Sequence, residues 1–190
     1  MRSIVVTEFI SLDGVIDSPG AGEHPHAGWT FKGIEFDPTA YEIKGREQEE
    51  AGALLLGRVT YFEFAPVWPS MDEQFARYNG LPKYVVSTTI EEPDLNPEWP
   101  HTQILRSLDE VAALKETDGG PILVHGSAEL AQSLAFAGLV DRYHLLTFPV
   151  LLGQGRRLFA GDDTPRQRLQ LVEHATFGNG IRLGVYDVRP

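Results

Sequence analysis

Two segments of the chain place an apolar run directly before glycine and hydroxyl residues. Residues 121–130 (PILVHGSAEL) have the pattern of a buried strand that leads into a helix, and residues 53–60 (ALLLGRVT) share it. The N-terminus of a helix presents unpaired N–H groups and the positive end of the helix dipole, so it can bind an anion. If both turns lie at the carboxyl edge of one sheet, they can hold two parts of a nucleotide. The sequence therefore predicts a phosphate-binding site built from two strand ends.

Each turn has a second, plainer interpretation. In the first turn, Gly57 allows close backbone approach, Arg58 can fork onto a phosphate and Thr60 can cap a helix. The same residues also suit an ordinary strand end, a surface arginine and an N-cap. In the second turn, Gly126 and Ser127 could receive a pyrophosphate, or Ser127 could simply cap the next helix. Neither a Gly-x-Gly-x-x-Gly fingerprint nor the long P-loop spacing is present.

Three further segments carry groups that could touch a ligand. Ser87, Thr88 and Thr89 end an apolar run and could line an adenosine or its phosphate, although turn chemistry explains them equally well. Residues 149–159 combine glycines with two arginines, which suits either a loop that closes over a ligand or a solvated crossover. Trp29 lies in a long loop rich in Gly, Pro and His, where it could stack on a planar ring or pack the loop against the sheet.

The composition excludes several other kinds of chemistry. The chain has no cysteine, no His-Glu-x-x-His and no Gly-x-Ser-x-Gly, so we expect no metal site, no disulfide and no serine hydrolase. A formal net charge of −11 argues against nucleic-acid and anionic-membrane partners. The longest apolar runs are too short to span a bilayer, and no leader pattern precedes Ser3. We therefore expect a cytoplasmic protein.

The elements that must position these residues alternate along the chain. The 190 residues, 42% of them apolar, fit one domain that spans 1–190. The patterns predict eight strands, at 3–10, 53–56, 83–87, 103–105, 122–124, 142–150, 168–176 and 181–188. They predict helices at 38–50, from Thr60 with a capping box, at 108–116 and at 128–137, and a hairpin turn at 178–180. This order indicates an α/β sandwich with a mostly parallel sheet and an antiparallel edge.

Short motifs in this order resemble the dihydrofolate reductase-like family, in particular the reductase (RibD C-terminal) domain of riboflavin-biosynthesis proteins. The motifs are SLDGVI at 11–16, LGRVTY at 56–61, YVVS at 84–87, HGS at 125–127 and PVLLGQG at 149–155. The resemblance covers nearly the whole chain. It implies a three-layer sandwich with helices on both faces of a mixed eight-stranded sheet.

The resemblance also implies a cofactor, NADPH, and the residues that hold it. Gly57, Arg58 and Thr60 match the phosphate-binding turn, with Arg58 near the adenosine 2′-phosphate, and Ser87 and Thr88 match the adenosine side. Gly126, Ser127, Ala128 and Glu129 match the pyrophosphate loop, while Ile16 falls where a loop covers the nicotinamide. Thr147 matches a position facing the reducible ring, and Trp29 is the other residue proposed for the substrate side.

The chain departs from the family pattern in two places. His125-Gly126 stands where the family usually has Gly-Gly, and neither Asp37 nor Glu42 is singled out as the carboxylate that dihydrofolate reductases use. No catalytic residue is therefore assigned.

By this resemblance the protein is expected to be an NADPH-dependent reductase of a small planar heterocycle, pterin- or pyrimidine-like, or a related compound. This is the chemistry of dihydrofolate reductases and of the phosphoribosylamino-uracil reductases of riboflavin synthesis, and a homodimer is expected on the same grounds. Two alternatives are a nucleotide-binding module of the same fold without turnover and a dimerising structural protein with vacant phosphate sites.

Overall fold

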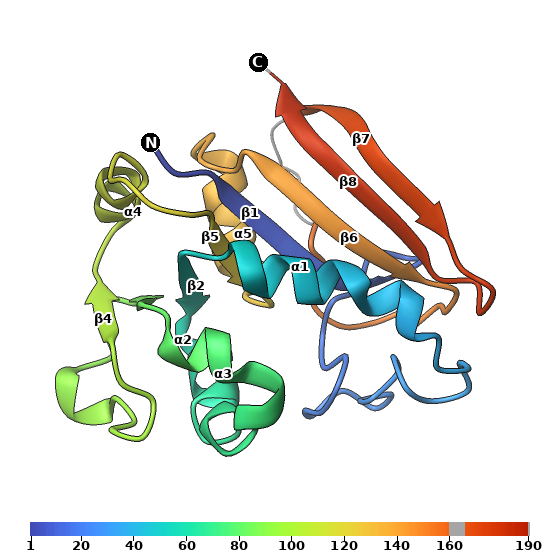
Figure 1. The fold of residues 1–190 in the computed structure, drawn as a ribbon, viewed down its shortest axis with the longest axis horizontal. Coiled ribbons are helices and arrows are strands. Elements are labelled where there is room, and N and C mark those ends of the chain that lie inside the picture. Colours follow the sequence, from blue (N-terminus) through green and yellow to red (C-terminus); the bar gives the residue numbers. More distant parts are fainter. Residues whose placement is uncertain (160–165, 190) are drawn as a thin grey trace.

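An eight-stranded sheet runs through the molecule, as seen in a computed structural model that describes residues 1–159 and 166–189 (Figure 1). Its order is β4-β3-β2-β5-β1-β6-β8-β7. The strands are β1 (Ile4–Ser11), β2 (Ala53–Gly57), β3 (Lys83–Val86), β4 (Thr102–Leu105), β5 (Ile122–His125), β6 (Arg142–Phe148), β7 (Arg168–Thr176) and β8 (Arg182–Arg189). Strands β1 to β6 pair in parallel, whereas β8 runs antiparallel to both β6 and β7. The expected eight strands and the C-terminal antiparallel hairpin are confirmed.

Helices cover both faces of the sheet. They are α1 (Glu42–Glu50), α2 (Arg58–Phe64), α3 (Asp72–Gly80), α4 (Leu108–Lys115) and α5 (Ala128–Phe136). Side chains of α4 and α5, such as Val111 and Leu134, share one apolar cluster with Ile4 of β1, while Ile43 of α1 and Tyr78 of α3 pack in clusters on the other face. Figure 1 accordingly shows α1 in front of the sheet and α5 behind it. In the described residues, none of these helices has the length and hydropathy needed to cross a bilayer.

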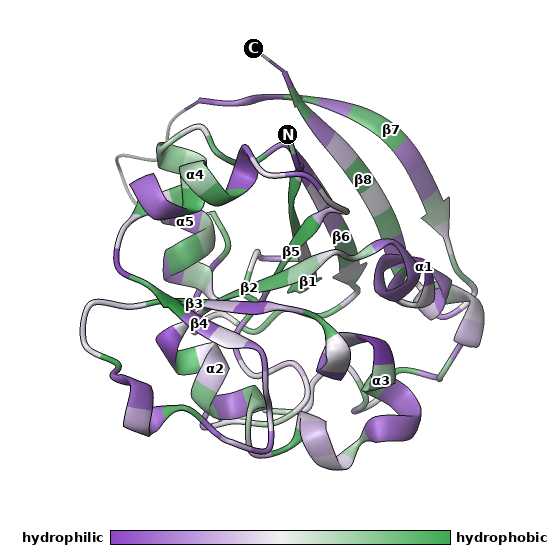
Figure 2. Cartoon of the chain, turned by 60° about the vertical axis from the view of Figure 1, so that its left-hand side comes forward, coloured by the Kyte–Doolittle hydropathy of each residue, from purple (hydrophilic) through white to green (hydrophobic). Residues whose placement is uncertain are grey.

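The central strands form the core, and their side chains alternate between its two faces. Figure 2 shows hydrophobic residues concentrated on β1, β2 and β5, and hydrophilic residues over α1 and α3. In β1, Ile4 and Val6 point toward α5, whereas Val5 belongs to the cluster on the opposite face. The next residues, Thr7 and Glu8, are polar yet buried. Buried polar residues in the middle of an apolar strand require hydrogen-bonding partners.

Several element boundaries differ from the prediction. Helix α2 begins at Arg58, so Thr60 lies inside its first turn and the capping box predicted there is wrong. The predicted helix 38–50 is a 3-10 turn, Pro38–Tyr41, followed by α1, and β6 ends at Phe148. Helix α3 was not predicted, because its short apolar anchors are separated by polar residues. The cap at Ser107 is confirmed, since its Oγ accepts a hydrogen bond from the Glu110 N–H at 3.3 Å.

Candidate functional site

The two turns singled out in the sequence lie against each other at the carboxyl edge of the sheet. Strands β2 and β5 are neighbours, so the residues that follow them meet. The Gly57 N–H donates to the Ser127 Oγ at 2.9 Å, and the Ser127 N–H donates to the Thr60 Oγ1 at 2.9 Å. This reciprocal pair of hydrogen bonds, here called the turn interlock, fixes the start of α2 relative to the start of α5. The predicted convergence of the two turns is confirmed.

The second turn is tight because two successive residues have left-handed backbone conformations. Gly126 has φ +57° and Ser127 has φ +60°. A Cβ at Gly126 would lie 3.2 Å from the Thr60 Oγ1, which leaves little room for any other residue. His125, by contrast, is the last residue of β5. The left-handed conformation that glycine favours is therefore required at positions 126 and 127, and not at His125. Ser127 adopts this conformation although it is not a glycine.

The turn interlock changes which amides remain for a ligand. The Gly57 and Ser127 N–H groups are already used, and the Ser127 hydroxyl makes no cap hydrogen bond to α5, so the interpretation of Ser127 as a side-chain N-cap is wrong. The amides of Ala128, Glu129 and Leu130, in the first turn of α5, have no acceptor within the helix. A bound phosphate would meet these three N–H groups and the positive end of the helix dipole.

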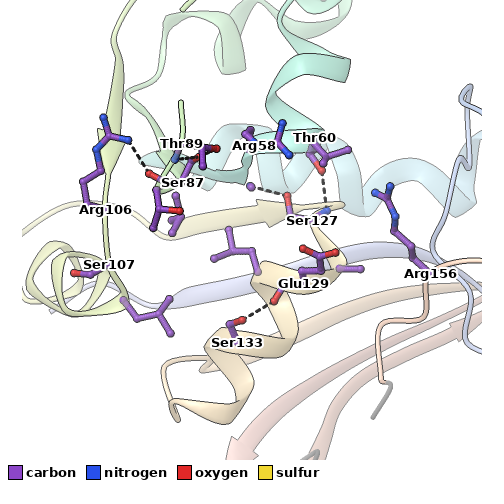
Figure 3. A pocket seen from close by; sticks show the side chains of 17 residues that line it. Arg58, Thr60, Ser87, Thr89, Arg106, Ser107, Ser127, Glu129, Ser133 and Arg156 are labelled. Atoms are coloured by element: carbon purple, nitrogen blue, oxygen red, sulfur yellow. Dashed lines mark hydrogen bonds between the residues drawn. The ribbon is translucent and has the colours of Figure 1, made fainter. Parts of the chain in front are cut away.

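A cavity of about 510 Å³ opens over both turns and extends along the strand ends (Figure 3). This volume is within the range of small-molecule and cofactor sites. The structure brings together eight of the ten residues that the sequence assigned to the cofactor. The lining includes Gly57, Arg58, Thr60, Ser87, Thr88, Ser127, Ala128 and Glu129 from that set, together with Thr89, Arg106, Ser107, Ser133 and Arg156. Gly126 is not among these lining residues, and it directly precedes Ser127, which is.

The cavity is positively charged although the chain is acidic. Its lining contains Arg58, Arg106 and Arg156 and one acidic residue, Glu129, so three positive charges stand against one negative. In Figure 3, Arg106 lies at one end beside Ser87, Arg156 lies at the other end, and Arg58 lies between them. Distant acidic groups are screened over about 8 Å at physiological salt. An anion in the cavity would therefore meet these arginines first, with Arg106 already paired to the Glu91 carboxylate at 3.2 Å.

Arg106 is a site residue that the sequence analysis missed. Its Nη1 donates to the carbonyl oxygens of Ser87 at 3.0 Å and Ile90 at 2.6 Å, and its Nη2 to Glu91 at 3.2 Å. These bonds hold the guanidinium beside the hydroxyl segment that follows β3. A single arginine after a short strand gives no local signal, so this placement required the sheet order.

The three remaining predicted residues lie outside the cavity lining. Ile16 is buried, and its N–H donates to the carbonyl oxygen of Arg156 at 2.9 Å, which places it beside one end of the cavity. Trp29 is buried, its Nε1 donates to the Asp17 carbonyl at 2.8 Å, and its ring packs edge-on against Phe148 at 5.4 Å. Thr147 precedes Phe148 in β6 and so points to the opposite face. The structure therefore does not bring Trp29 and Thr147 into one site.

Two loops beside the cavity are joined through Asp13. Its carboxylate accepts hydrogen bonds from the Ser11 hydroxyl at 2.6 Å, the Leu152 N–H at 3.1 Å and the Gly153 N–H at 2.7 Å. The Ser11 hydrogen bond and these backbone amides outweigh partial desolvation and lower the pKa of Asp13 to about 2. Arg157 also donates to the Asp13 carbonyl oxygen. The segment from Ser11 to Ile16 is thus fixed to the arginine-bearing loop that contains Arg156.

A second group of polar residues lies on the other face of the sheet, between α1, α3 and the central strands. We call it the α1 cluster; its members are Thr7, Lys44, Glu47, Tyr78, His125 and His144. Sequence reasoning missed it, because its members lie far apart in the chain. The one local signal is that Thr7 and His144 interrupt apolar strands.

The sheet order, the antiparallel C-terminal hairpin and the helices on both faces are those of a dihydrofolate reductase-like fold. The RibD C-terminal domain family matches residues 2–183, and the chain belongs to this family. It is 28% identical over 191 residues to the uncharacterized protein YyaP of Bacillus subtilis (strain 168), covering 97% of this chain and 94% of YyaP.

Solved structures show the same fold. A protein of Shewanella sp. PV-4, described as a riboflavin biosynthesis protein, has a TM-score of 0.75 at 21% identity and covers 100% of both chains. A dihydrofolate reductase from Enterococcus faecalis, solved in complex with NADP(H), has a TM-score of 0.58 at 12% identity, over 99% of this chain and 97% of that chain. These likenesses establish the architecture that the motifs predicted.

Proposed function

We propose that the protein is an NADPH-dependent reductase that transfers hydride to a small planar heterocycle of the pterin or pyrimidine type. The observation that carries this proposal is the cavity over the turn interlock, which combines the α5 N-terminus with three arginines and three hydroxyl residues after β3. Membership of the RibD C-terminal family supports a reductase. The family likeness also favours a cytoplasmic location and a homodimer. Sedimentation velocity would test the homodimer.

The α5 end of the cavity suits a pyrophosphate. The free amides of Ala128, Glu129 and Leu130 face it, and the helix dipole adds about 0.3–1 kcal/mol of favourable interaction with an anion. The Glu129 carboxylate opposes part of this attraction. Arg156, which also lines the cavity, provides the compensating positive charge.

The β3 end suits an adenosine that carries a phosphate on its ribose. Ser87 and Thr88 offer hydroxyl groups there, and Arg58 and Arg106 flank them (Figure 3). Arg106 is held in place by the carbonyl oxygens of Ser87 and Ile90, so little side-chain entropy would be lost when it pairs with a phosphate. We therefore assign the 2′-phosphate to Arg58, as the resemblance implies, and add Arg106 as its second contact.

Reduced nicotinamide would supply the hydride, and the residues of the chain would supply orientation and exclusion of water. The buried Ile16 and the Asp13-linked loops border the end of the cavity near Arg156. The nicotinamide ring would therefore extend from the phosphate-binding part of the cavity toward this end.

Calorimetric titration with NADPH and NADH tests the cofactor. We expect the wild type to bind NADPH more tightly, and both Arg58→Ala and Arg106→Ala to weaken NADPH by about 1.5–3 kcal/mol each, with little change for NADH. Arg168→Ala, an exposed arginine on β7, is the matched control for loss of charge.

Equal losses for the two cofactors would reject the 2′-phosphate assignment. In a thermal-shift assay, NADPH at about 100 times its Kd should add about 2.7 kcal/mol of stability, so no shift with either cofactor would reject the proposed function. NADPH binding without oxidation against a pterin and pyrimidine panel would favour the alternative of a nucleotide-binding module.

A further inference from the structure

Three residues of the α1 cluster stand in a row across the central strands. Thr7 of β1 is the register partner of His125 in β5 on one side and of His144 in β6 on the other. Lys44 and Glu47 reach this row from α1, and Tyr78 reaches it from α3, with its ring centroid 5.3 Å from that of His125. Side chains from five elements therefore converge on one face of the sheet.

Glu47 organises the row. Its Oε1 accepts hydrogen bonds from the Thr7 hydroxyl at 2.7 Å and from the His144 Nδ1 at 2.8 Å, while its Oε2 lies 3.2 Å from the Lys44 Nζ. Burial alone would raise the pKa of Glu47, but the Lys44 charge and the His144 hydrogen bond outweigh it and lower the pKa to about 2. Glu47 is therefore a carboxylate, and the His144 Nδ1 carries the proton that is donated to it. The His144 ring is fixed with its other nitrogen pointing away from α1's carboxylate.

Three further polar groups of the cluster have no hydrogen-bond partner among the described residues. Within residues 1–159 and 166–189, the His144 Nε2, the His125 Nε2 and the Tyr78 hydroxyl are buried and make no hydrogen bond. His144 and Tyr78 are 8% and 3% exposed, so each is more than nine-tenths buried. A buried polar group left unpaired costs about 1–3 kcal/mol. These three groups belong to one cluster, and a ligand with its own donors and acceptors would satisfy them.

The α1 cluster adjoins the cofactor cavity. His125 is the residue immediately before Gly126 and Ser127, whose turn forms the base of that cavity. A ring that extends from the cavity past Gly126 would reach the end of β5 at His125, whose register partner in the middle of β1 is Thr7. The Lys44 side chain is 20% exposed, so the α1 end of the cluster is in contact with water.

We propose that the α1 cluster receives the polar edge of the substrate and that His144, oriented by Glu47, is the proton donor of the reduction. This inference rests on the proposed function. Hydride from reduced nicotinamide would add to the carbon of a C=N or C=O bond, and the His144 Nε2–H would donate a proton to its nitrogen or oxygen. The π bond is replaced by a C–H and an N–H or O–H bond. The neutral imidazole then regains its proton from water.

The surroundings favour an uncharged substrate edge. Lys44 and Glu47 already neutralise each other, His125 and Tyr78 offer neutral hydrogen-bonding groups, and β8 contributes the apolar Val185 opposite His144. Glu8, a further titratable residue of β1, lies on its far face, and burial raises its pKa well above the ordinary range. The substrate class is therefore a small neutral heterocycle that carries a C=N or C=O bond.

Two substitutions and one control test the proton donor. His144→Asn keeps an N–H close to the Nδ1 position for the Glu47 hydrogen bond but cannot donate a proton, and Glu47→Gln removes the charge that orients the ring. His174→Asn, on the exposed strand β7, is the control. NADPH affinity is measured first, then NADPH oxidation against pH with 6-methylpterin, 7,8-dihydropterin and 5-aminouracil.

We expect His144→Asn to bind NADPH within about twofold of the wild type and to lower kcat by about 100-fold or more, the usual contribution of a general acid. The wild-type rate should fall as pH rises, and this fall should be absent from the variant. A kcat within threefold of the wild type, or an unchanged pH profile, would overturn the proposal. Failure of the wild type to bind NADPH would instead reject the proposed function.

A second measurement does not depend on turnover. In protein labelled with ¹⁵N in its histidine rings and saturated with NADPH, binding of a panel compound should move the Nε2 signals of His125 and His144 and leave that of His174 in place. If none of the three compounds moves these signals, the cluster holds water only and the proposal is wrong, whatever the outcome for the cofactor.

Discussion

Replacement of Thr60 by valine tests whether the turn interlock holds the site together. Thr60 is 5% exposed, and its hydroxyl accepts the Ser127 N–H at 2.9 Å. Valine has almost the same volume, so the substitution removes the acceptor without opening a cavity. The Ser127 N–H would then lie in a partly buried position without a partner, at a cost of about 1–3 kcal/mol. For a chain of 190 residues this corresponds to a decrease in Tm of about 2–4 °C per kcal/mol.

Urea unfolding and NADPH titration would measure both consequences. Ser127→Ala, which removes the acceptor of the Gly57 N–H, completes a double-mutant cycle, and two groups in one network should show a coupling energy of about 0.5–3 kcal/mol. Thr176→Val, at the exposed end of β7, is the control for the loss of a hydroxyl. A loss below about 0.5 kcal/mol with unchanged NADPH affinity would refute the idea that these hydrogen bonds position the cavity.

Three other perturbations have defined outcomes. Burial lowers the pKa of His125 from 6.5 to about 3, so the unfolded chain binds a proton that the folded chain does not, and stability falls as pH drops through this window. Between pH 6 and 5, the free energy of unfolding measured in urea should fall with decreasing pH by about 1 kcal/mol per pH unit less in His125→Gln than in the wild type. Equal pH dependence in the two proteins would contradict this. Asp13→Asn should cost about 1–3 kcal/mol, since one amide N–H would face the Gly153 N–H; proteolysis rates near that loop should rise, and unchanged rates would argue against the link. Gly155→Ala should lower the Tm, because Gly155 has φ +110° and the new Cβ would lie 2.8 Å from the Val15 Cγ1; a Tm equal to that of the wild type would show that the loop relaxes freely.

The parts of the fold that the sequence predicted are those encoded by adjacent residues. The apolar runs 53–56 and 122–124 and the hairpin signal at 178–180 each specify an element within a few positions, and the structure contains each of them. Sheet order adds that β2 and β5 are neighbours, and this brings the two predicted turns together. The site was predictable to the extent that it consists of strand ends.

What could not be predicted depends on contacts between distant segments. Thr60 satisfies the spacing of a capping box, yet its hydroxyl accepts a hydrogen bond from the Ser127 N–H, 67 positions away. This contact with a distant segment replaces the local cap that the sequence pattern predicts. The pairing of Glu47 with His144 spans 97 positions and requires the register of β1 against β6. Trp29 packs against Phe148, whereas Thr147 points to the opposite face of β6, because side chains alternate along a strand. The sequence alone does not show which residues of β6 point to which face.

Ser127 shows how these levels combine at one position. Its left-handed backbone costs a non-glycine residue about 1–3 kcal/mol, and glycine would avoid that cost. The serine hydroxyl, however, accepts the Gly57 N–H and donates to the His125 carbonyl at 3.1 Å. It therefore connects the end of β2, which is followed by Arg58 of the cavity lining, to β5, whose last side chain belongs to the α1 cluster. Ser127 thus fixes the turn beside the cavity and also the backbone of His125 in the α1 cluster. A substitution that disturbs either the cavity or the cluster should therefore affect the other.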